Sequence, residues 1–170
     1  GIDPKSIDTV LITHAHSDHI GGLVAADGSL TYPNANYYIS QAEWDFWTDP
    51  QVSLPNSLLD VKSKQSMIQG AQQTLKVIKN QTKFFEFGTE IIPGIIATET
   101  TGHTPGHTSY LITSEQNKLI ATGDIFYSDP LNLEHPDWEV AEVDYKLFEL
   151  VILALLSQDP DLSQAIRDGK

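Results

Sequence analysis

The chain has 170 residues, of which 23 are acidic and 10 basic, so its formal net charge is −13. The length suits one domain over residues 1–170, and 40% apolar residues is typical of a globular protein. So negative a chain disfavours nucleic acid as a partner, because neutralising phosphates requires clustered Lys and Arg. The absence of cysteine excludes disulfides, thiolate metal sites and a cysteine nucleophile.

No run of the sequence reaches the roughly 18 apolar residues of a membrane-spanning helix, so we expect no membrane partner. The chain opens on Gly1. The compartment is therefore left open between the cytoplasm and, if a leader has been removed, the periplasm or the exterior.

The strand predictions come in chain order. A β-branched run at residues 7–13 predicts a buried strand, Asp27-Gly28 predicts a turn, and residues 37–39 predict a second strand. Further short strands are expected at residues 84–87, 91–92, 95–100, 109–113 and 118–122.

The helix predictions begin at Ser40 and Glu43, which fit a capping box in which Glu43 reaches back to the amide of Ser40. A longer helix is expected over residues 58–79. Its apolar face would hold Leu58, Val61, Met67, Ala71, Leu75 and Ile78. Two more helices are expected, over residues 144–156 and from residue 159 onward. This alternation of strands and helices predicts the α/β class.

The strongest chemical signal lies directly after the first predicted strand. Residues 14–19 read HAHSDH, so three of the six histidines of the chain fall within six residues. In an extended backbone, residues i and i+2 point the same way, so His14 and His16 can hold one ion. Asp18 and His19 lie past the strand end and can turn toward a second position. Nitrogen and carboxylate ligands without thiolate suit Zn, Mn, Fe or Co.

Two later loops add similar residues, each after a predicted strand. A glycine-flanked turn at residues 101–107 carries His103 and His107, and Asp124 follows the strand at residues 118–122. Three strand-end loops with nitrogen or oxygen ligands are what a metal site at one edge of a sheet requires.

Together, HAHSDH with Gly21-Gly22, HTPGHT at residues 103–108 and TGD at residues 122–124 resemble the metallo-β-lactamase-fold hydrolases. The resemblance extends over residues 1 to about 145 and is closest to the lactonase and organophosphate hydrolase branch. It implies an αβ/βα sandwich of mixed sheets with flanking helices. The sandwich would be incomplete, because the family carries several strands before HxHxDH and a later strand with a further histidine ligand.

The resemblance also implies a dinuclear centre with two Zn²⁺ ions per chain, Mn, Fe or Co being alternatives. Its ligands would be His14, His16 and His107 for one metal, Asp18 and His19 for the other, and Asp124 bridging both. His103 would orient the turn. Beyond Asp124 the chain offers only His135, so the second metal is expected to lack a ligand and bind more weakly. A homodimer is left open.

The expected activity is hydrolysis, with hydroxide generated at the metals attacking a small ester, lactone, thioester or phosphotriester. The expected catalytic residues are Asp18, Asp124 and Tyr127, the last as a hydrogen-bond donor to the developing oxyanion. A mononuclear iron dioxygenase on the same scaffold is an alternative, which iron content and oxygen consumption would distinguish. A truncated chain that binds metal without catalysis is another.

Overall fold

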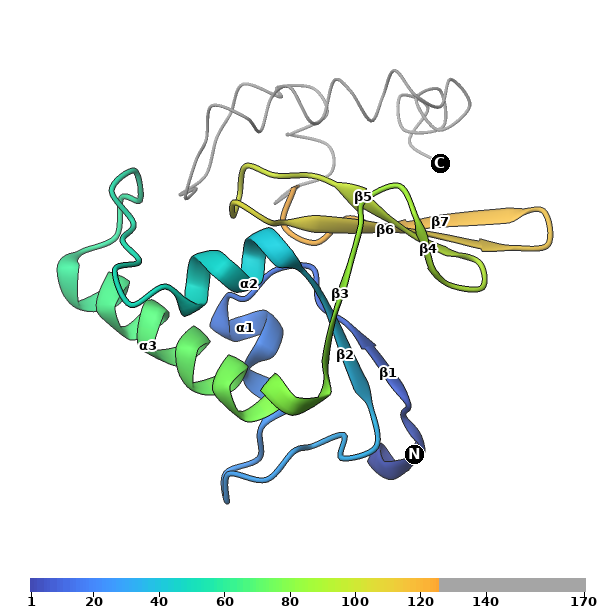
Figure 1. The fold of residues 1–170 in the computed structure, drawn as a ribbon, viewed down its shortest axis with the longest axis horizontal. Coiled ribbons are helices and arrows are strands. Elements are labelled where there is room, and N and C mark those ends of the chain that lie inside the picture. Colours follow the sequence, from blue (N-terminus) through green and yellow to red (C-terminus); the bar gives the residue numbers. More distant parts are fainter. Residues whose placement is uncertain (126–170) are drawn as a thin grey trace.

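The computed structural model describes residues 1–125, which form two β-sheets with helices packed beside the first (Figure 1). The first sheet is parallel, with the order β1-β2-β3. Its strands are β1 (Thr9–Leu11), β2 (Asn36–Ser40) and β3 (Thr82–Phe85). The second is antiparallel, with the order β4-β5-β6-β7. Its strands are β4 (Glu90–Ile92), β5 (Ile95–Glu99), β6 (Thr108–Ser114) and β7 (Asn117–Ala121). The predicted α/β class is confirmed.

The helical elements come largely from the first two thirds of the described chain. They are η1 (Pro4–Ser6), α1 (Ser17–Ile20), η2 (Gly21–Leu23), α2 (Gln41–Thr48), α3 (Val61–Ile78) and η3 (Lys79–Gln81). Within residues 1–125, no helix is both long and apolar enough to cross a lipid bilayer.

The long helix α3 begins later than its apolar pattern predicted. Asp60 caps it by accepting hydrogen bonds from the amides of Lys62 and Ser63 at 2.9 and 3.0 Å. Leu58 therefore precedes the helix and is 88% exposed, and Val61, its first residue, is 73% exposed. The prediction that both join the buried face was wrong, because Leu58 lies before the cap and the buried residues of α3 come from its C-terminal half, far from Val61.

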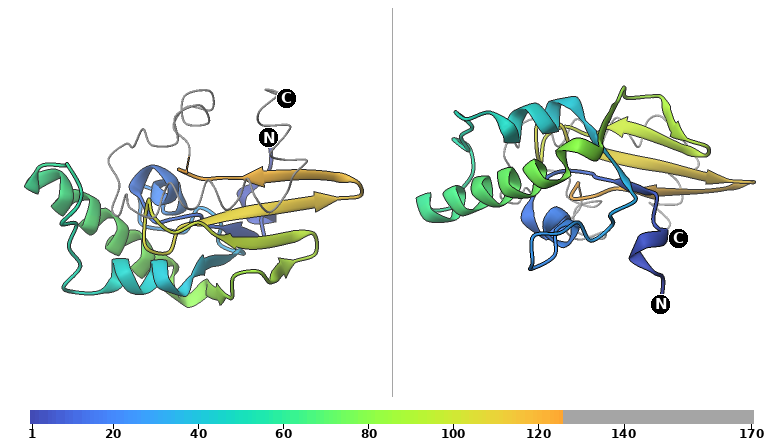
Figure 2. Two further views of the ribbon diagram at one scale, coloured as in Figure 1. Left: turned by 90° about the horizontal axis from the view of Figure 1, so that it is seen from above. Right: turned by 60° about the horizontal axis from the view of Figure 1, so that its bottom comes forward.

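The main core lies between the first sheet and the helices. The C-terminal half of α3 contributes Ala71, Leu75 and Ile78, which are buried in one cluster with Tyr37 and Ile39 of β2. The hairpin of β6 and β7 extends away from this core and from the helices (Figure 2). The described core therefore supports the first sheet, and the second sheet is joined to it mainly at one edge.

That shared edge joins the end of β1 to the start of β6. The Thr108 amide donates to the Thr13 carbonyl at 2.9 Å, and the Tyr110 hydroxyl donates to the Ile12 carbonyl at 2.7 Å. Because β5, β6 and β7 are antiparallel, the end of β5, the start of β6 and the end of β7 all lie at this edge. The three loops that the sequence singled out therefore meet there.

The helix α2 forms as predicted, but its capping box is only half present. Ser40 Oγ accepts from the Glu43 amide at 3.1 Å, as an N-cap residue should. The Glu43 side chain does not return to the Ser40 amide. It is fully buried and hydrogen-bonded to other segments, so the expected reciprocal bond was wrong. The Glu43 carboxylate accepts hydrogen bonds from donors distant in the sequence instead of from the Ser40 amide.

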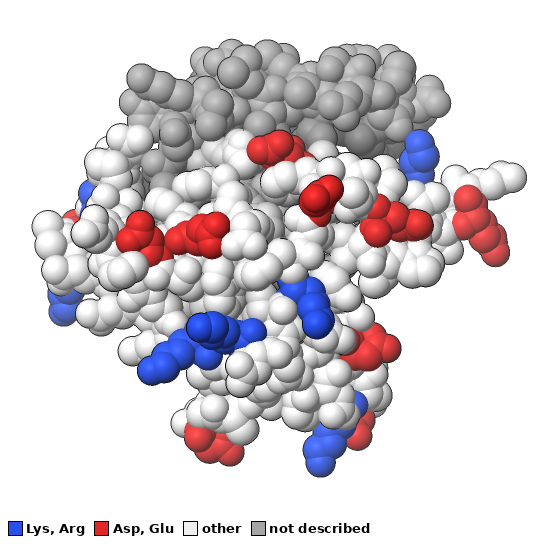
Figure 3. Space-filling model, in the orientation of Figure 1, with Lys and Arg blue, Asp and Glu red and all other residues white. Residues whose placement is uncertain are grey.

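Several predictions lie outside the described residues and stay predictions. They concern Tyr127, His135, the helix over residues 144–156 and the helix from residue 159 onward. On the face of the molecule shown in Figure 3, the Lys and the acidic side chains of the described residues are interspersed.

Candidate metal centre

Four histidines from two loops converge at the shared sheet edge. His14 and His16 follow β1, and His103 and His107 lie in the turn between β5 and β6. All four are buried, with at most 7% of the surface of any of them exposed. The His14 ring is in contact with each of the others, at centroid distances of 4.7 Å to His16, 4.6 Å to His103 and 5.0 Å to His107.

Three of these side chains aim nitrogen atoms at one point. His103 Nε2 lies 3.2 Å from His14 Nε2 and 2.9 Å from His16 Nδ1. Two nitrogens bound tetrahedrally to one zinc ion at 2.0–2.1 Å would be roughly 3.3–3.4 Å apart. We call His14, His16 and His103 the nitrogen triad. Its geometry is already close to that of a metal-binding set.

A carboxylate group lies beside the triad. Asp124 Oδ1 is 3.0 Å from His19 Nε2, while its Oδ2 is 3.6 Å from His103 Nε2 and 3.9 Å from His14 Nε2. His14, His19 and Asp124 form a second set of potential ligand atoms that all lie within 4.8 Å of one another. Asp124 thus lies between the triad and His19, as a bridging ligand would.

Asp18 stands at the outer side of this arrangement. Its Oδ2 is 3.6 Å from His19 Nε2, and its side chain is 77% exposed. It belongs to α1, a single helical turn that begins immediately after His16. Asp18 therefore lies beside His19, and its charge also acts on the neighbouring His16.

His107 occupies a different environment from the triad. Its Nδ1 is 2.8 Å from Thr100 Oγ1, and its Nε2 accepts a hydrogen bond from the Asp124 amide at 3.1 Å. Since the Nε2 lone pair is engaged by an N–H group, the proton of the neutral ring belongs on Nδ1, where Thr100 Oγ1 accepts it. Both ring nitrogens of His107 then have protein partners.

Burial favours the neutral form of His14, His16 and His107. Desolvation, followed by the neighbouring His103, lowers the pKa of His16 to about 3, and desolvation is also the main cause that lowers the pKa of His107 to about 3. The pKa of His14 is lowered further by the same cause. Neutral histidines present the lone pairs that a divalent metal requires, so metal need not displace protons from them at neutral pH.

The residues present fit a metal ion. His103 Nε2 offers a single hydrogen-bonding site, either one N–H group or one lone pair, so it cannot form a full hydrogen bond with His14 Nε2 and with His16 Nδ1 at the same time. A cation at the centre would use all three lone pairs at once.

The two histidines of the turn lie in different surroundings in the structure. His103, expected to orient the turn, joins the triad, whereas His107, expected to be a ligand, contacts the loop of Asp124. The spacing of the sequence offers both imidazoles equally, and only the path of the turn decides which one points inward. His14, His16, His19 and Asp124 lie together, with Asp18 beside His19.

Sequence reasoning missed one residue next to the site. It assigned Glu43 to the helix cap, whereas the structure hydrogen-bonds it to both histidine loops. The pattern of α2 gave no signal for this, because the partners of Glu43 are distant in the sequence. They are the backbone amide of Ala15 and the turn of Thr104 and Gly106, which lies about sixty residues after Glu43.

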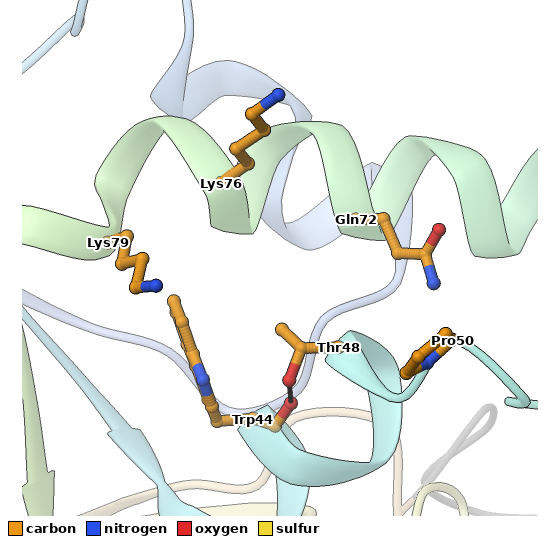
Figure 4. A pocket seen from close by; sticks show the side chains of 6 residues that line it. All are labelled: Trp44, Thr48, Pro50, Gln72, Lys76 and Lys79. Carbon is orange, nitrogen blue, oxygen red and sulfur yellow. Dashed lines mark hydrogen bonds between the residues drawn. The ribbon is translucent and has the colours of Figure 1, made fainter.

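A separate hollow of about 520 Å³ lies between α2 and α3 (Figure 4). It is lined by Trp44, Thr48, Pro50, Gln72, Lys76 and Lys79. None of the predicted metal ligands or catalytic residues lines it, and we assign it no part in the metal centre.

The fold and the site define a class of protein: an α/β protein with a candidate metal centre built from histidines and a carboxylate in the loops that follow its strands. The chain belongs to the metallo-beta-lactamase superfamily, whose family model matches residues 1–149. The predicted resemblance to this superfamily is confirmed.

Individual relatives point the same way. The structure of AidC, a dizinc quorum-quenching lactonase in complex with a product, matches with a TM-score of 0.86 and 32% identity, over 93% of this chain and 55% of that one. The hydrolase AbOPH matches with a TM-score of 0.81 and 28% identity, over 93% and 55%. The protein YobT of Bacillus subtilis (strain 168) is 33% identical over 122 residues, 72% of this chain and 47% of YobT. An N-acyl homoserine lactonase of Bacillus sp is 26% identical over 132 residues, 75% of this chain and 42% of that protein. The chain thus spans about half the length of these relatives.

Proposed function

We propose that this chain carries the metal centre of a metal-dependent hydrolase. The observation that carries the proposal is the convergence of the nitrogen triad with His19 and Asp124 at one sheet edge. The superfamily membership and the lactonase and hydrolase neighbours support it.

We assign the first metal to the nitrogen triad and the second to His19 with Asp18, and we assign Asp124 to both. The distances from the two Asp124 oxygens to His19 and to the triad support the bridging role. The dizinc description of AidC supports zinc as the metal and two ions as the number. Tyr127, which follows the described residues, remains our candidate for donating a hydrogen bond to the developing oxyanion.

When bound, such metals supply hydroxide at neutral pH and polarise the oxygen of a carbonyl or phosphoryl group. The chain supplies what surrounds that chemistry. The imidazoles of His14 and His16 stay neutral, and His107 holds the Asp124 loop through the Asp124 amide. The exposed carboxylate of Asp18 can take a proton and release it to solvent.

A small lactone is the substrate class that we favour, with esters, thioesters and phosphotriesters as the wider group. The support comes from relatives, because AidC is described as a lactonase and a curated relative is an N-acyl homoserine lactonase.

Metal analysis and a substrate panel test the proposal. The purified chain, loaded with Zn²⁺ and freed of excess, should retain metal by mass spectrometry and hydrolyse an N-acyl homoserine lactone. An aryl ester and an aryl phosphotriester complete the panel. If the chain binds metal but hydrolyses the phosphotriester alone, the substrate class is a phosphotriester and not a lactone. Failure to retain any metal would refute the proposal.

A further inference from the structure

Glu43 is the buried acidic residue that the metal ligands do not include. It lies in the first turn of α2 and is 0% exposed. A carboxylate removed from water is strongly unfavourable unless it is fully hydrogen-bonded. Burial raises the pKa of Glu43, while hydrogen bonds from its neighbours favour the charged form. A residue retained under these conditions calls for a role that an apolar side chain would not fill.

Its two oxygens accept hydrogen bonds from three separate segments. Oε1 accepts from the Ala15 amide at 2.8 Å and from Trp47 Nε1 at 2.7 Å. Oε2 accepts from Thr104 Oγ1 at 2.6 Å and from the Gly106 amide at 3.0 Å. Because amide and indole N–H groups can only donate, the geometry matches an ionised carboxylate that uses both oxygens.

The identity of these partners is informative. Ala15 lies between His14 and His16, and Thr104 follows His103 directly. One oxygen therefore holds the loop with two members of the nitrogen triad, and the other holds the turn with the third. The carboxylate spans the two segments whose separation sets the N···N distances of the triad.

The turn also packs closely on the start of α2. Ser40 Oγ donates to the Gly106 carbonyl at 2.6 Å. A Cβ at Gly106 would collide with the backbone nitrogen of Glu43 and lie 2.5 Å from Ser40 Oγ. The turn thus packs directly on the N-terminus of α2, and the Glu43 side chain connects the same end of the helix to the loop after β1.

We propose that Glu43 is a positioning residue for the metal centre, which fixes the first-metal histidines relative to one another through the main chain of Ala15 and Gly106 and the hydroxyl of Thr104. The inference rests on the proposed function, because it presupposes that the triad binds metal. It predicts that substitution of Glu43 weakens metal binding by more than the accompanying loss of folding stability explains.

The test compares Zn²⁺ affinity, by competition with a chromophoric chelator, among variants whose unfolding is measured in parallel. Glu43→Gln keeps the size of the side chain but turns an N–H group toward the Gly106 amide. We expect it to weaken Zn²⁺ binding about tenfold or more, the loss typical of removing an outer partner of a metal ligand. At saturating Co²⁺, its visible absorption should also differ from that of the wild type.

Two controls separate positioning from stability. Asp45→Asn makes the same charge change on an exposed position of α2 and should leave affinity unchanged. Ile78→Ala should destabilise the core, in which Ile78 is buried. Ile78 is also far from the metal centre along α3: it lies eight residues, or about 12 Å, from Gly70, where the helix contacts Ser17 next to His16. A folded Ile78→Ala chain should keep its Zn²⁺ affinity and Co²⁺ spectrum.

A milder pair of variants covers the case in which Glu43→Gln does not fold. Thr104→Val removes one donor to Oε2 and should weaken Zn²⁺ binding, and Thr104→Ser, which keeps the hydroxyl, should restore it. If the wild type binds Zn²⁺ and Glu43→Gln binds it with the same affinity, this inference alone is overturned. Where Glu43→Gln does not fold, an unchanged Zn²⁺ affinity in Thr104→Val has the same consequence. Absence of wild-type Zn²⁺ binding would instead refute the proposed function and the inference with it.

Discussion

His107 Nε2 accepts a hydrogen bond from the backbone amide of Asp124 at 3.1 Å. The bond joins the turn between β5 and β6 to the loop after β7, at the point where the carboxylate meets the nitrogen triad. A histidine that the sequence offered as a metal ligand thus braces the residue that we assign to both metals.

The two histidines of the turn should respond differently to substitution. His103→Ala removes a nitrogen that lies 2.9 and 3.2 Å from the other triad nitrogens, so it should weaken first-metal binding by more than 100-fold. His107→Ala leaves the triad in place and should weaken binding about 10- to 100-fold at most. Zn²⁺ titration of both variants checks this. Loss of metal from His107→Ala with retention in His103→Ala would restore His107 as the ligand.

Gly123→Ala should destabilise the fold more than substitution at another glycine with positive φ. Gly123 has φ +61°, and a Cβ there would lie 2.6 Å from His107 Nε2. Gly28 has φ +85° and open space around it. Gly28→Ala should lose about 1 kcal/mol from backbone strain alone, and Gly123→Ala an additional 1–3 kcal/mol from the collision. Urea unfolding measures both. Equal losses would contradict the close packing of His107.

The metal-free chain should lose stability as the pH falls below about 6.5. The pKa values of His16 and His107 are lowered from 6.5 to about 3 in the fold. Between these values the unfolded chain binds more protons than the folded one, so the free energy of unfolding decreases as pH decreases. Urea midpoints of metal-free protein between about pH 7.5 and 4 measure the slope.

The control for this slope is His107→Gln, whose side chain does not titrate. Its stability should fall less steeply in the same window. The comparison is needed because the raised pKa of Glu43 acts in the opposite direction. A slope unchanged by His107→Gln would show that this imidazole has the same pKa in the folded and the unfolded chain.

Chelation should remove the two metals in separate steps. The first metal has three buried imidazoles, whereas the second relies on His19 and Asp18, whose side chains are 29% and 77% exposed, together with the shared Asp124. The second should leave first, and activity should follow this weaker step. A chelator titration with simultaneous activity assays tests it. Cooperative loss of both metals would mean that a further ligand completes the second position.

The sequence by itself determined the elements and their chemistry. Apolar runs ending in His, Asp and Gly marked β1, the turn after β5 and the loop after β7, because strand periodicity and loop composition are local properties. The HAHSDH segment placed His14 and His16 together for the same reason: residues a few positions apart cannot separate far. These local signals were enough to predict the fold class and the metal-binding edge.

Only the tertiary structure decided which imidazoles face one another. His103 and His107 stand in nearly equivalent local sequence, and the packing of Gly106 on α2 turns one inward and the other toward Asp124. The role of Glu43 was likewise hidden, since its partners in the two histidine loops lie 28 to 63 residues away in the sequence. Local pattern places a capping residue at the start of a helix, whereas desolvation and competing long-range donors decide where its carboxylate goes.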